Sequence, residues 1–141
     1  MRLNNLIVVF SVYAAACISL IHGYCVYNFT DDVSYRVRQL SQNSGVFDLG
    51  RFYRESLKPG ESACCPYTNH DCNSTGDKNA LIKVMFLGGT PTHKQLRINF
   101  PAGGWVEIRG KGTDRPKVNA YYPDGTPFPF ELVTTDSCFF C

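Results

Sequence analysis

The sequence predicts an all-β fold, an antiparallel β-sandwich of seven to eight strands stapled by disulfides. Three observations indicate this fold. Apolar and polar residues alternate in short runs after residue 24, Pro and Gly separate these runs, and the chain contains seven cysteines. Alternation with a period of two is typical of a strand that buries one face, and short strands between regular turns are typical of a sandwich or barrel.

Residues 1–23 have the pattern of a signal peptide for secretion. Arg2 precedes an apolar run from Leu6 to Ile21, and the small residue Gly23 offers a cleavage point before Tyr24. The apolar run falls just short of the roughly 17–25 residues that span a bilayer, so a membrane anchor is the less favoured alternative. We therefore expect a single disulfide-stabilised domain over residues 24–141, with no transmembrane segment in the mature chain.

The cysteines and two N-glycosylation sequons also favour secretion. A second cleavage point, before Cys17, would keep that cysteine, whereas cleavage after Gly23 leaves an even set, which is expected in an oxidising compartment. The predicted localisation is therefore secreted and extracellular. Asn28 and Asn73 begin N-glycosylation sequons that agree with it. The cysteines predicted to form disulfides are Cys25, Cys64, Cys65, Cys72, Cys138 and Cys141.

The expected strands follow one another along the chain. The first begins at Cys25, and strand-like alternation recurs at 33–40, 80–87, 95–100, 104–110, 117–122 and 128–133. Residues 80–87 are apolar on both faces, which predicts a central strand. A strand is also expected to start after the Pro59-Gly60 turn. The apolar residues of 45–57 fit neither the strand period of two nor the helical period of about 3.6. A strand with a bulge at Gly50 is preferred there to a helical turn at 51–56.

The cysteine spacing favours disulfides over a metal site. Side chains of the neighbours Cys64 and Cys65 point to opposite faces of a strand, so we expect them to bridge to different partners. Cys72 is expected to bridge locally to one of the two, and the cysteines near the ends of the domain to take the rest. Adjacent cysteines with His70 do not form the knuckle of a zinc site, and no helix follows the C-x-x-C pair that ends at Cys141. We expect no metal and no cofactor.

Charge and motifs exclude several functions. The net charge is +2, and the basic residues are scattered among acidic ones without forming a cluster. Nucleic acid is therefore not an expected partner. The best catalytic constellation is Glu107, Arg109 and His93, with Tyr53 or Glu55 as a further member, and it matches the residue types of small secreted ribonucleases. An exposed strand face with an ion pair explains the same residues, and no hydrolase motif accompanies them, so we assign no catalytic residue.

Trp105 marks the predicted binding surface. It shares one face of a strand with Glu107 and Arg109, opposite Val106 and Ile108. If the two aliphatic residues point inward, the indole lies outside beside polar groups, where it can stack on a sugar ring or anchor a protein. Trp105, Glu107 and Arg109 are therefore the predicted ligand-binding residues.

The signal peptide, the paired cysteines, the β-rich pattern and the lack of a catalytic motif resemble the small secreted cysteine-rich proteins of fungi and other eukaryotic microbes, often called effector-like. The resemblance is to a class and covers the whole chain. It implies a non-enzymatic binding module that recognises a protein or glycan outside the cell. Two alternatives stay open: a small secreted hydrolase or ribonuclease using Glu107, Arg109 and His93, and a lipid-binding sandwich.

Overall fold

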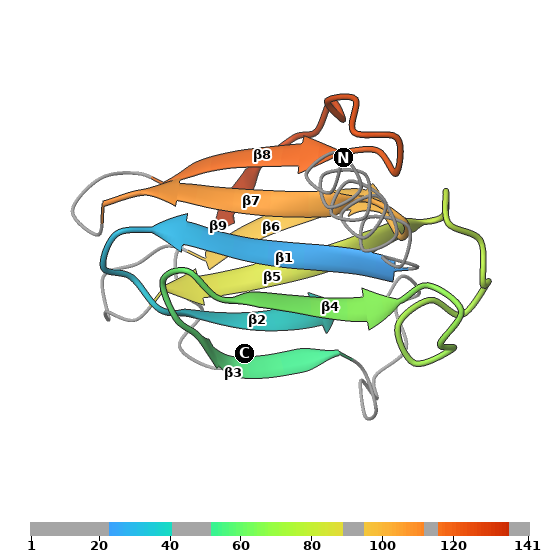
Figure 1. The fold of residues 1–141 in the computed structure, drawn as a ribbon, viewed down its shortest axis with the longest axis horizontal. Coiled ribbons are helices and arrows are strands. Elements are labelled where there is room, and N and C mark those ends of the chain that lie inside the picture. The colour runs from blue at the N-terminus through green and yellow to red at the C-terminus, as the bar shows by residue number, and fades with distance from the viewer. Residues whose placement is uncertain (1–22, 41–51, 89–94, 112–115, 136–141) are drawn as a thin grey trace, which may run out of the picture.

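The computed structural model describes residues 23–40, 52–88, 95–111 and 116–135. These residues form an all-β sandwich of two sheets (Figure 1), which confirms the predicted fold class. In the described part of the chain, no helix is long and apolar enough to cross a membrane. Within these four ranges the strands number nine, one more than the upper end of the prediction: β1 (Gly23–Thr30), β2 (Tyr35–Leu40), β3 (Tyr53–Leu57), β4 (Ser62–Pro66), β5 (Leu81–Gly88), β6 (Gln95–Pro101), β7 (Trp105–Gly110), β8 (Lys117–Tyr121) and β9 (Val133–Thr135).

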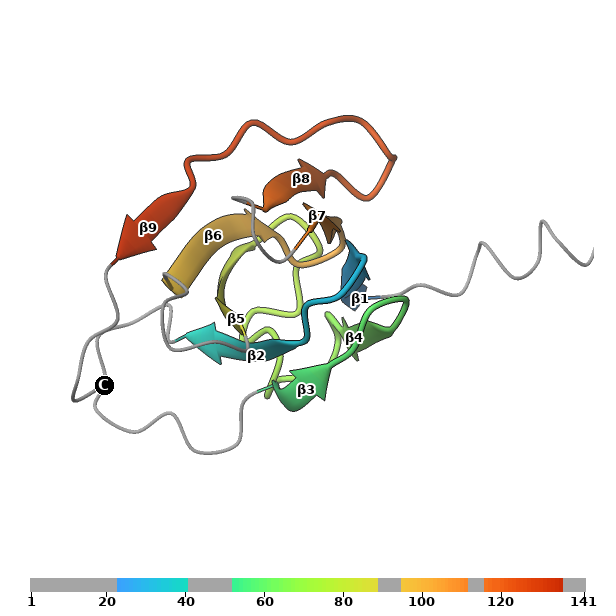
Figure 2. The ribbon, with the colours of Figure 1, turned by 90° about the vertical axis from the view of Figure 1, so that its left-hand side faces the viewer.

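The two sheets differ in their strand pairing. The four-stranded sheet has the order β4-β1-β7-β8, and within it β1 runs parallel to β7 while the other pairs are antiparallel. The five-stranded sheet has the order β3-β2-β5-β6-β9 and is antiparallel throughout. Figure 2 shows the strands of the two sheets on opposite sides of the interior. The antiparallel prediction therefore holds for every pair except β1 with β7.

The alternation of the sequence places one face of each sheet in the core. Along β7, Val106 and Ile108 are fully buried, while Trp105 and Glu107 on the other face are half-buried. Strand β5 lies between β2 and β6, the central position that its two apolar faces predicted. Its second face is only partly covered, because Leu81 remains 52% exposed.

The fully buried Tyr24 joins the two sheets across the core. Its ring makes edge-to-face contacts with Phe52 and Phe100, at centroid distances of 5.3 Å and 5.9 Å. Its hydroxyl donates a hydrogen bond of 2.9 Å to Oε1 of Gln39, on β2 in the opposite sheet. A fully buried phenol needs such a partner, so this contact fixes how the sheets sit on each other.

The expected strand at 128–133 is wrong over most of its length. Only β9, from Val133, pairs with β6, and the preceding residues instead run from one sheet to the other along an edge of the sandwich (Figure 2). Pro127 and Pro129 lack the N–H groups that a strand ladder needs. Phe128, Phe130 and Leu132 still pack against the core.

The segment 45–57, which fitted neither period, agrees with the predicted strand where the structure describes it. Residues Tyr53–Leu57 form β3, so the helical turn proposed for 51–56 does not form over these residues. The bulge expected at Gly50 lies outside the described residues.

Candidate ligand-binding site

Two disulfides fix the region around β4. Cys25 and Cys64 face each other across the antiparallel pair β1–β4, and Cys65 bridges to Cys72, seven residues further on. This confirms that the adjacent cysteines take different partners and that Cys72 bridges locally. Because the four sulfur atoms are bonded in pairs, they are not available as metal ligands. In the ranges described, no group of three or more His, Cys, Asp or Glu side chains could hold a metal ion.

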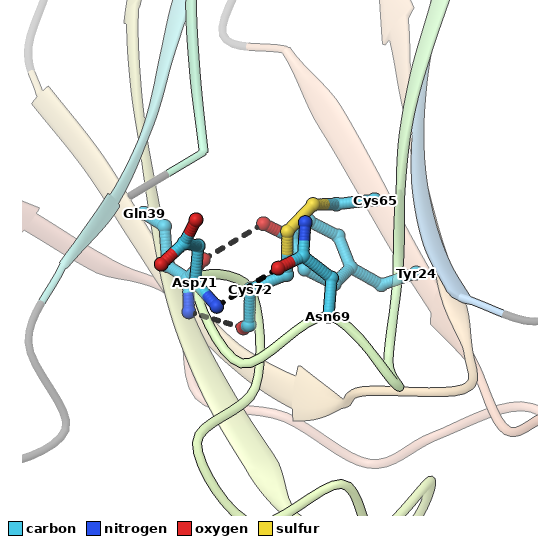
Figure 3. The surroundings of a disulfide bond; sticks show 6 residues. All are labelled: Tyr24, Gln39, Cys65, Asn69, Asp71 and Cys72. Atoms are coloured by element: carbon cyan, nitrogen blue, oxygen red, sulfur yellow. Dashed lines mark hydrogen bonds between the residues drawn. A yellow bond between two sulfur atoms is a disulfide. The ribbon is translucent and has the colours of Figure 1, made fainter. Parts of the chain in front are cut away.

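The loop closed by Cys65 and Cys72 is tied to the core rather than open to a ligand (Figure 3). Nε2 of Gln39 donates a hydrogen bond of 2.6 Å to the carbonyl oxygen of Cys72. The backbone N–H of Cys72 donates one of 2.9 Å to the carbonyl oxygen of Asn69. His70 is exposed on this loop. The segment therefore has a structural role. Cys138 and Cys141 lie outside the described residues, so their pairing stays a prediction.

The outer face of the four-stranded sheet carries the residues predicted to bind a ligand. Trp105, Glu107 and Arg109 follow one another on this face of β7, because Val106 and Ile108 between them point into the core. The parallel neighbour β1 places Cys25 beside Trp105, Tyr27 beside Glu107 and Phe29 beside Arg109. On the other side, β8 places Tyr121, Asn119 and Lys117 beside the same three residues.

Aromatic rings form two stacks on this face. Trp105 lies on Tyr121, with ring centroids 5.0 Å apart and planes 21° from parallel. Tyr27 lies on Phe29 at 5.7 Å, and the guanidinium carbon of Arg109 sits 4.6 Å from the centre of the Phe29 ring. Such offset stacks and cation–π contacts orient side chains that would otherwise rotate freely.

Glu107 and Arg109 form an ion pair along the same strand. Nε and Nη2 of Arg109 both donate to Oε2 of Glu107, at 3.1 Å and 3.0 Å. Oε1 of Glu107 is not used by this pair, and 17% of the Glu107 side chain is exposed. The pair therefore holds the carboxylate in place while leaving one oxygen to accept a further hydrogen bond.

Trp105 and Glu107 border a pocket of about 430 Å³. One wall is formed by the turn after β8, where Gly125 has a φ of 87° that favours glycine. A Cβ at Gly125 would lie 3.5 Å from Cη2 of Trp105, so this turn closely approaches the indole. The pocket is lined by Tyr27, Phe29, Gly103, Trp105, Glu107, Pro123, Asp124 and Gly125.

Asp124 brings a second carboxylate to the pocket. One of its oxygens, Oδ1, accepts hydrogen bonds from the hydroxyl and the backbone N–H of Thr126, at 2.7 Å and 2.9 Å. The hydroxyl and then the N–H lower the pKa of the Asp124 carboxyl below its usual value. The group is therefore an anion at neutral pH, and the pocket combines aromatic rings with two carboxylates.

The structure gathers some of the predicted residues and separates others. Trp105 and Glu107 line the pocket, and Arg109 adjoins it through Glu107 and Phe29. Tyr53 and Glu55 lie on β3, in the other sheet, where Glu55 pairs with Arg36 of β2. They do not join Glu107, which corrects that part of the expected catalytic constellation. His93 lies outside the described residues.

Tyr27, Phe29 and Asp124 belong to the site but were not among the residues predicted from the sequence. A signal for the first two exists, since aromatic residues two apart on a strand share a face. Their position beside β7 depends on a parallel pairing between segments far apart in the sequence. The predicted glycosylation sites Asn28 and Asn73 are buried elsewhere in the fold, at 0% and 1% exposure.

Comparison of the chain with protein-family models, with curated proteins and with solved structures finds no match.

Proposed function

We propose that the protein is a secreted, non-enzymatic binding module that holds a sugar unit of an extracellular glycan in the pocket beside Trp105. The observation that carries the proposal is the position of the indole: Trp105 stacks on Tyr121 and lines the pocket together with Tyr27 and Phe29 of β1 and with the turn after β8. The two disulfides fit an oxidising, extracellular environment.

The chemistry of the pocket matches a sugar ring. A pyranose has C–H faces that pack against aromatic rings and hydroxyl groups that donate to oxygen acceptors. Here Trp105 and Tyr27 supply rings, while Glu107 and Asp124 supply carboxylate oxygens, and a hydrogen bond to an ionised acceptor is stronger than one to a neutral acceptor. Because stacking and the close turn at Gly125 already orient the indole, little side-chain freedom is lost on binding.

The size of the pocket favours a glycan over a protein surface. About 430 Å³ lies in the ~300–1,000 Å³ range of sites for small ligands, whereas a stable protein interface buries about 800 Å² on each partner. A protein that inserts one side chain into the pocket is the alternative, with Trp105 as its anchor. Competition by free sugars distinguishes the two.

The other two readings have less support. Nε and Nη2 of Arg109 both donate to Glu107, and a hydrolase would need His93, outside the described residues, to reach this pair. An assay for RNA or glycan cleavage tests it. A lipid carrier would need a cavity between the sheets, and in the described residues the fully buried side chains of Tyr24, Phe86 and Phe100 occupy that space.

The proposal is tested by intrinsic fluorescence, because Trp105 is the single tryptophan of the chain. The purified protein is titrated with soluble oligosaccharides representing cell-wall and cell-surface glycans. We expect a saturable change in emission with at least one of them, and a loss of binding of about tenfold or more in Trp105→Ala, measured by calorimetry.

Tyr53→Ala is the matched control, because Tyr53 is an aromatic residue 50% exposed on the other sheet. It should bind like the wild type. Equal affinity of the wild type and W105A for every glycan that binds would exclude this pocket as the site.

A further inference from the structure

Three Asx-x-Thr triplets of this chain share one hydrogen-bonding geometry. In each, the backbone N–H and the hydroxyl of the Thr donate to Oδ1 of the Asn or Asp two residues earlier. The N–H distances are 3.1, 3.3 and 2.9 Å, and the hydroxyl distances 2.6, 2.9 and 2.7 Å. Such local clamps satisfy polar groups where the chain turns or leaves a ladder. The triplets are Asn28-Phe29-Thr30, Asn73-Ser74-Thr75 and Asp124-Gly125-Thr126.

The triplets differ in what surrounds the first residue. Asn28 is fully buried, and its Nδ2 donates to the carbonyl oxygens of Val33 and Leu57, at 2.7 Å and 2.8 Å. Asn73 is 1% exposed, and its Nδ2 donates to the carbonyl oxygen of Asp77 at 2.7 Å. Asp124 is exposed and carries a carboxylate in place of an amide.

This difference explains the residue types. An Asp at position 28 would bring a carboxylate against two carbonyl oxygens in the core, and a buried charge without a donor is costly. Asn supplies both an acceptor and two donors from one side chain. At the exposed position 124 water solvates the charge, so Asp is tolerated. The two sequons are therefore accounted for by the hydrogen bonds they make.

The same hydrogen bonds oppose glycan transfer. Glycosylation joins Nδ2 to C1 of a sugar: the C1–O bond to the lipid pyrophosphate donor breaks, and one amide proton leaves. At Asn28 both amide hydrogens already point at backbone carbonyls inside the sandwich, where a bulky surface group cannot fit. At Asn73 the amide is buried as well.

We propose that both sequons are internal clamps and that the natively folded protein carries no glycan at Asn28 or Asn73. The clamp at Asn28 connects β1 of one sheet to the end of β3 in the other, through Leu57. A chain glycosylated there before it folds would lose this connection and fail to close the sandwich.

The first test uses a eukaryotic secretory host. The full chain and D124N are expressed, and intact mass is measured with and without enzymatic deglycosylation. D124N is the matched control, because it makes the triplet at 124–126 a sequon with the same local geometry at an exposed position. We expect one glycan on D124N and none on the folded wild type.

Glycosylated wild-type chains found only in the aggregated fraction would agree with the proposal. A folded, disulfide-bonded monomer with a glycan at Asn28 or Asn73 would overturn the proposal.

The second test measures the clamp in protein made without glycosylation, in an oxidising bacterial compartment. T30V and T126V both remove a hydroxyl that donates to Oδ1, one buried and one exposed. We expect T30V to lower Tm by about 4–8 °C, and T126V by about 2 °C or less. If T30V does not fold, T30S, which keeps the hydroxyl, should fold with a Tm near that of the wild type. Equal melting of T30V and T126V would refute a structural role for the clamp.

Discussion

Tyr121 lies face to face with Trp105 across the antiparallel pair β7–β8, with ring centroids 5.0 Å apart. The indole is therefore supported from one side before any ligand arrives. Tyr121 itself is not among the residues that line the pocket, so its effect on binding would be indirect.

Tyr121→Ala should weaken glycan binding less than W105A does. An aromatic pair contributes roughly 0.5–1.5 kcal/mol beyond its buried area, so we expect a loss of affinity of about 3–10-fold. The emission of Trp105 should shift to longer wavelength, because water reaches the exposed face of the ring. Tyr121→Phe keeps the stack and should behave like the wild type. Unchanged affinity in Y121A would show that the stack does not prepare the site.

Glu107→Gln separates binding from stability. The variant keeps the shape of the side chain but removes its charge, and Arg109, its partner, is half exposed. Exposed ion pairs contribute about 0–1 kcal/mol, so Tm should fall by only a few degrees. If Oε1 accepts a sugar hydroxyl, the affinity should drop by about tenfold. Calorimetric titration with the glycan found for the wild type measures it, and an unchanged Kd would remove Glu107 from the contact.

The sandwich could be predicted from local patterns because its strands depend on them. Alternation along 104–110 correctly placed Trp105 outside and Val106 inside, and the same rule sent Cys64 and Cys65 to different partners. The prediction failed at 128–133, where alternation was present but Pro129, and Pro127 just before the segment, lack the N–H groups that a ladder needs.

The pocket could be predicted only in part. Tyr27 and Phe29 meet Trp105 and Glu107 because β1 runs parallel to β7, and that pairing joins residues 80 positions apart in the chain. Asp124 enters through a turn whose position depends on how β8 ends. Local patterns carry no information about either, so the β7 residues could be predicted from the sequence and their neighbours could not.

The buried phenols should make the protein sensitive to alkaline pH. Burial raises the pKa of Tyr24, and burial followed by the charge of Asp32 raises that of Tyr35. The folded state thus binds these protons more tightly than the unfolded state, whose phenols titrate near pH 10. Their contribution is complete below about pH 10 and is lost as the pH rises further, by about 1.4 kcal/mol per pH unit for each proton.

Tyr24→Phe tests this dependence by urea unfolding between pH 8 and 11. The variant has no phenolic proton at position 24, so its free energy of unfolding should fall less steeply above pH 10. At pH 8 it should already be less stable by about 1–3 kcal/mol, because Oε1 of Gln39 loses its buried donor. Parallel curves for the wild type and Y24F would contradict the assignment.

Gly23 has two separate reasons to be small, and one substitution distinguishes them. It satisfies the predicted cleavage point before Tyr24, and in the fold a Cβ at this position would lie 2.1 Å from the carbonyl oxygen of Cys65. Gly23→Ala keeps a small residue for the signal peptidase, but its Cβ has no room in the strand.

If cleavage follows residue 23, secreted G23A and wild type should both begin with Tyr24 and melt at the same temperature. If cleavage instead precedes Cys17, position 23 stays in β1, and G23A should melt several degrees lower. Mass spectrometry of the mature N-terminus decides between these outcomes independently of the melting curve, and we expect Tyr24 as the first residue.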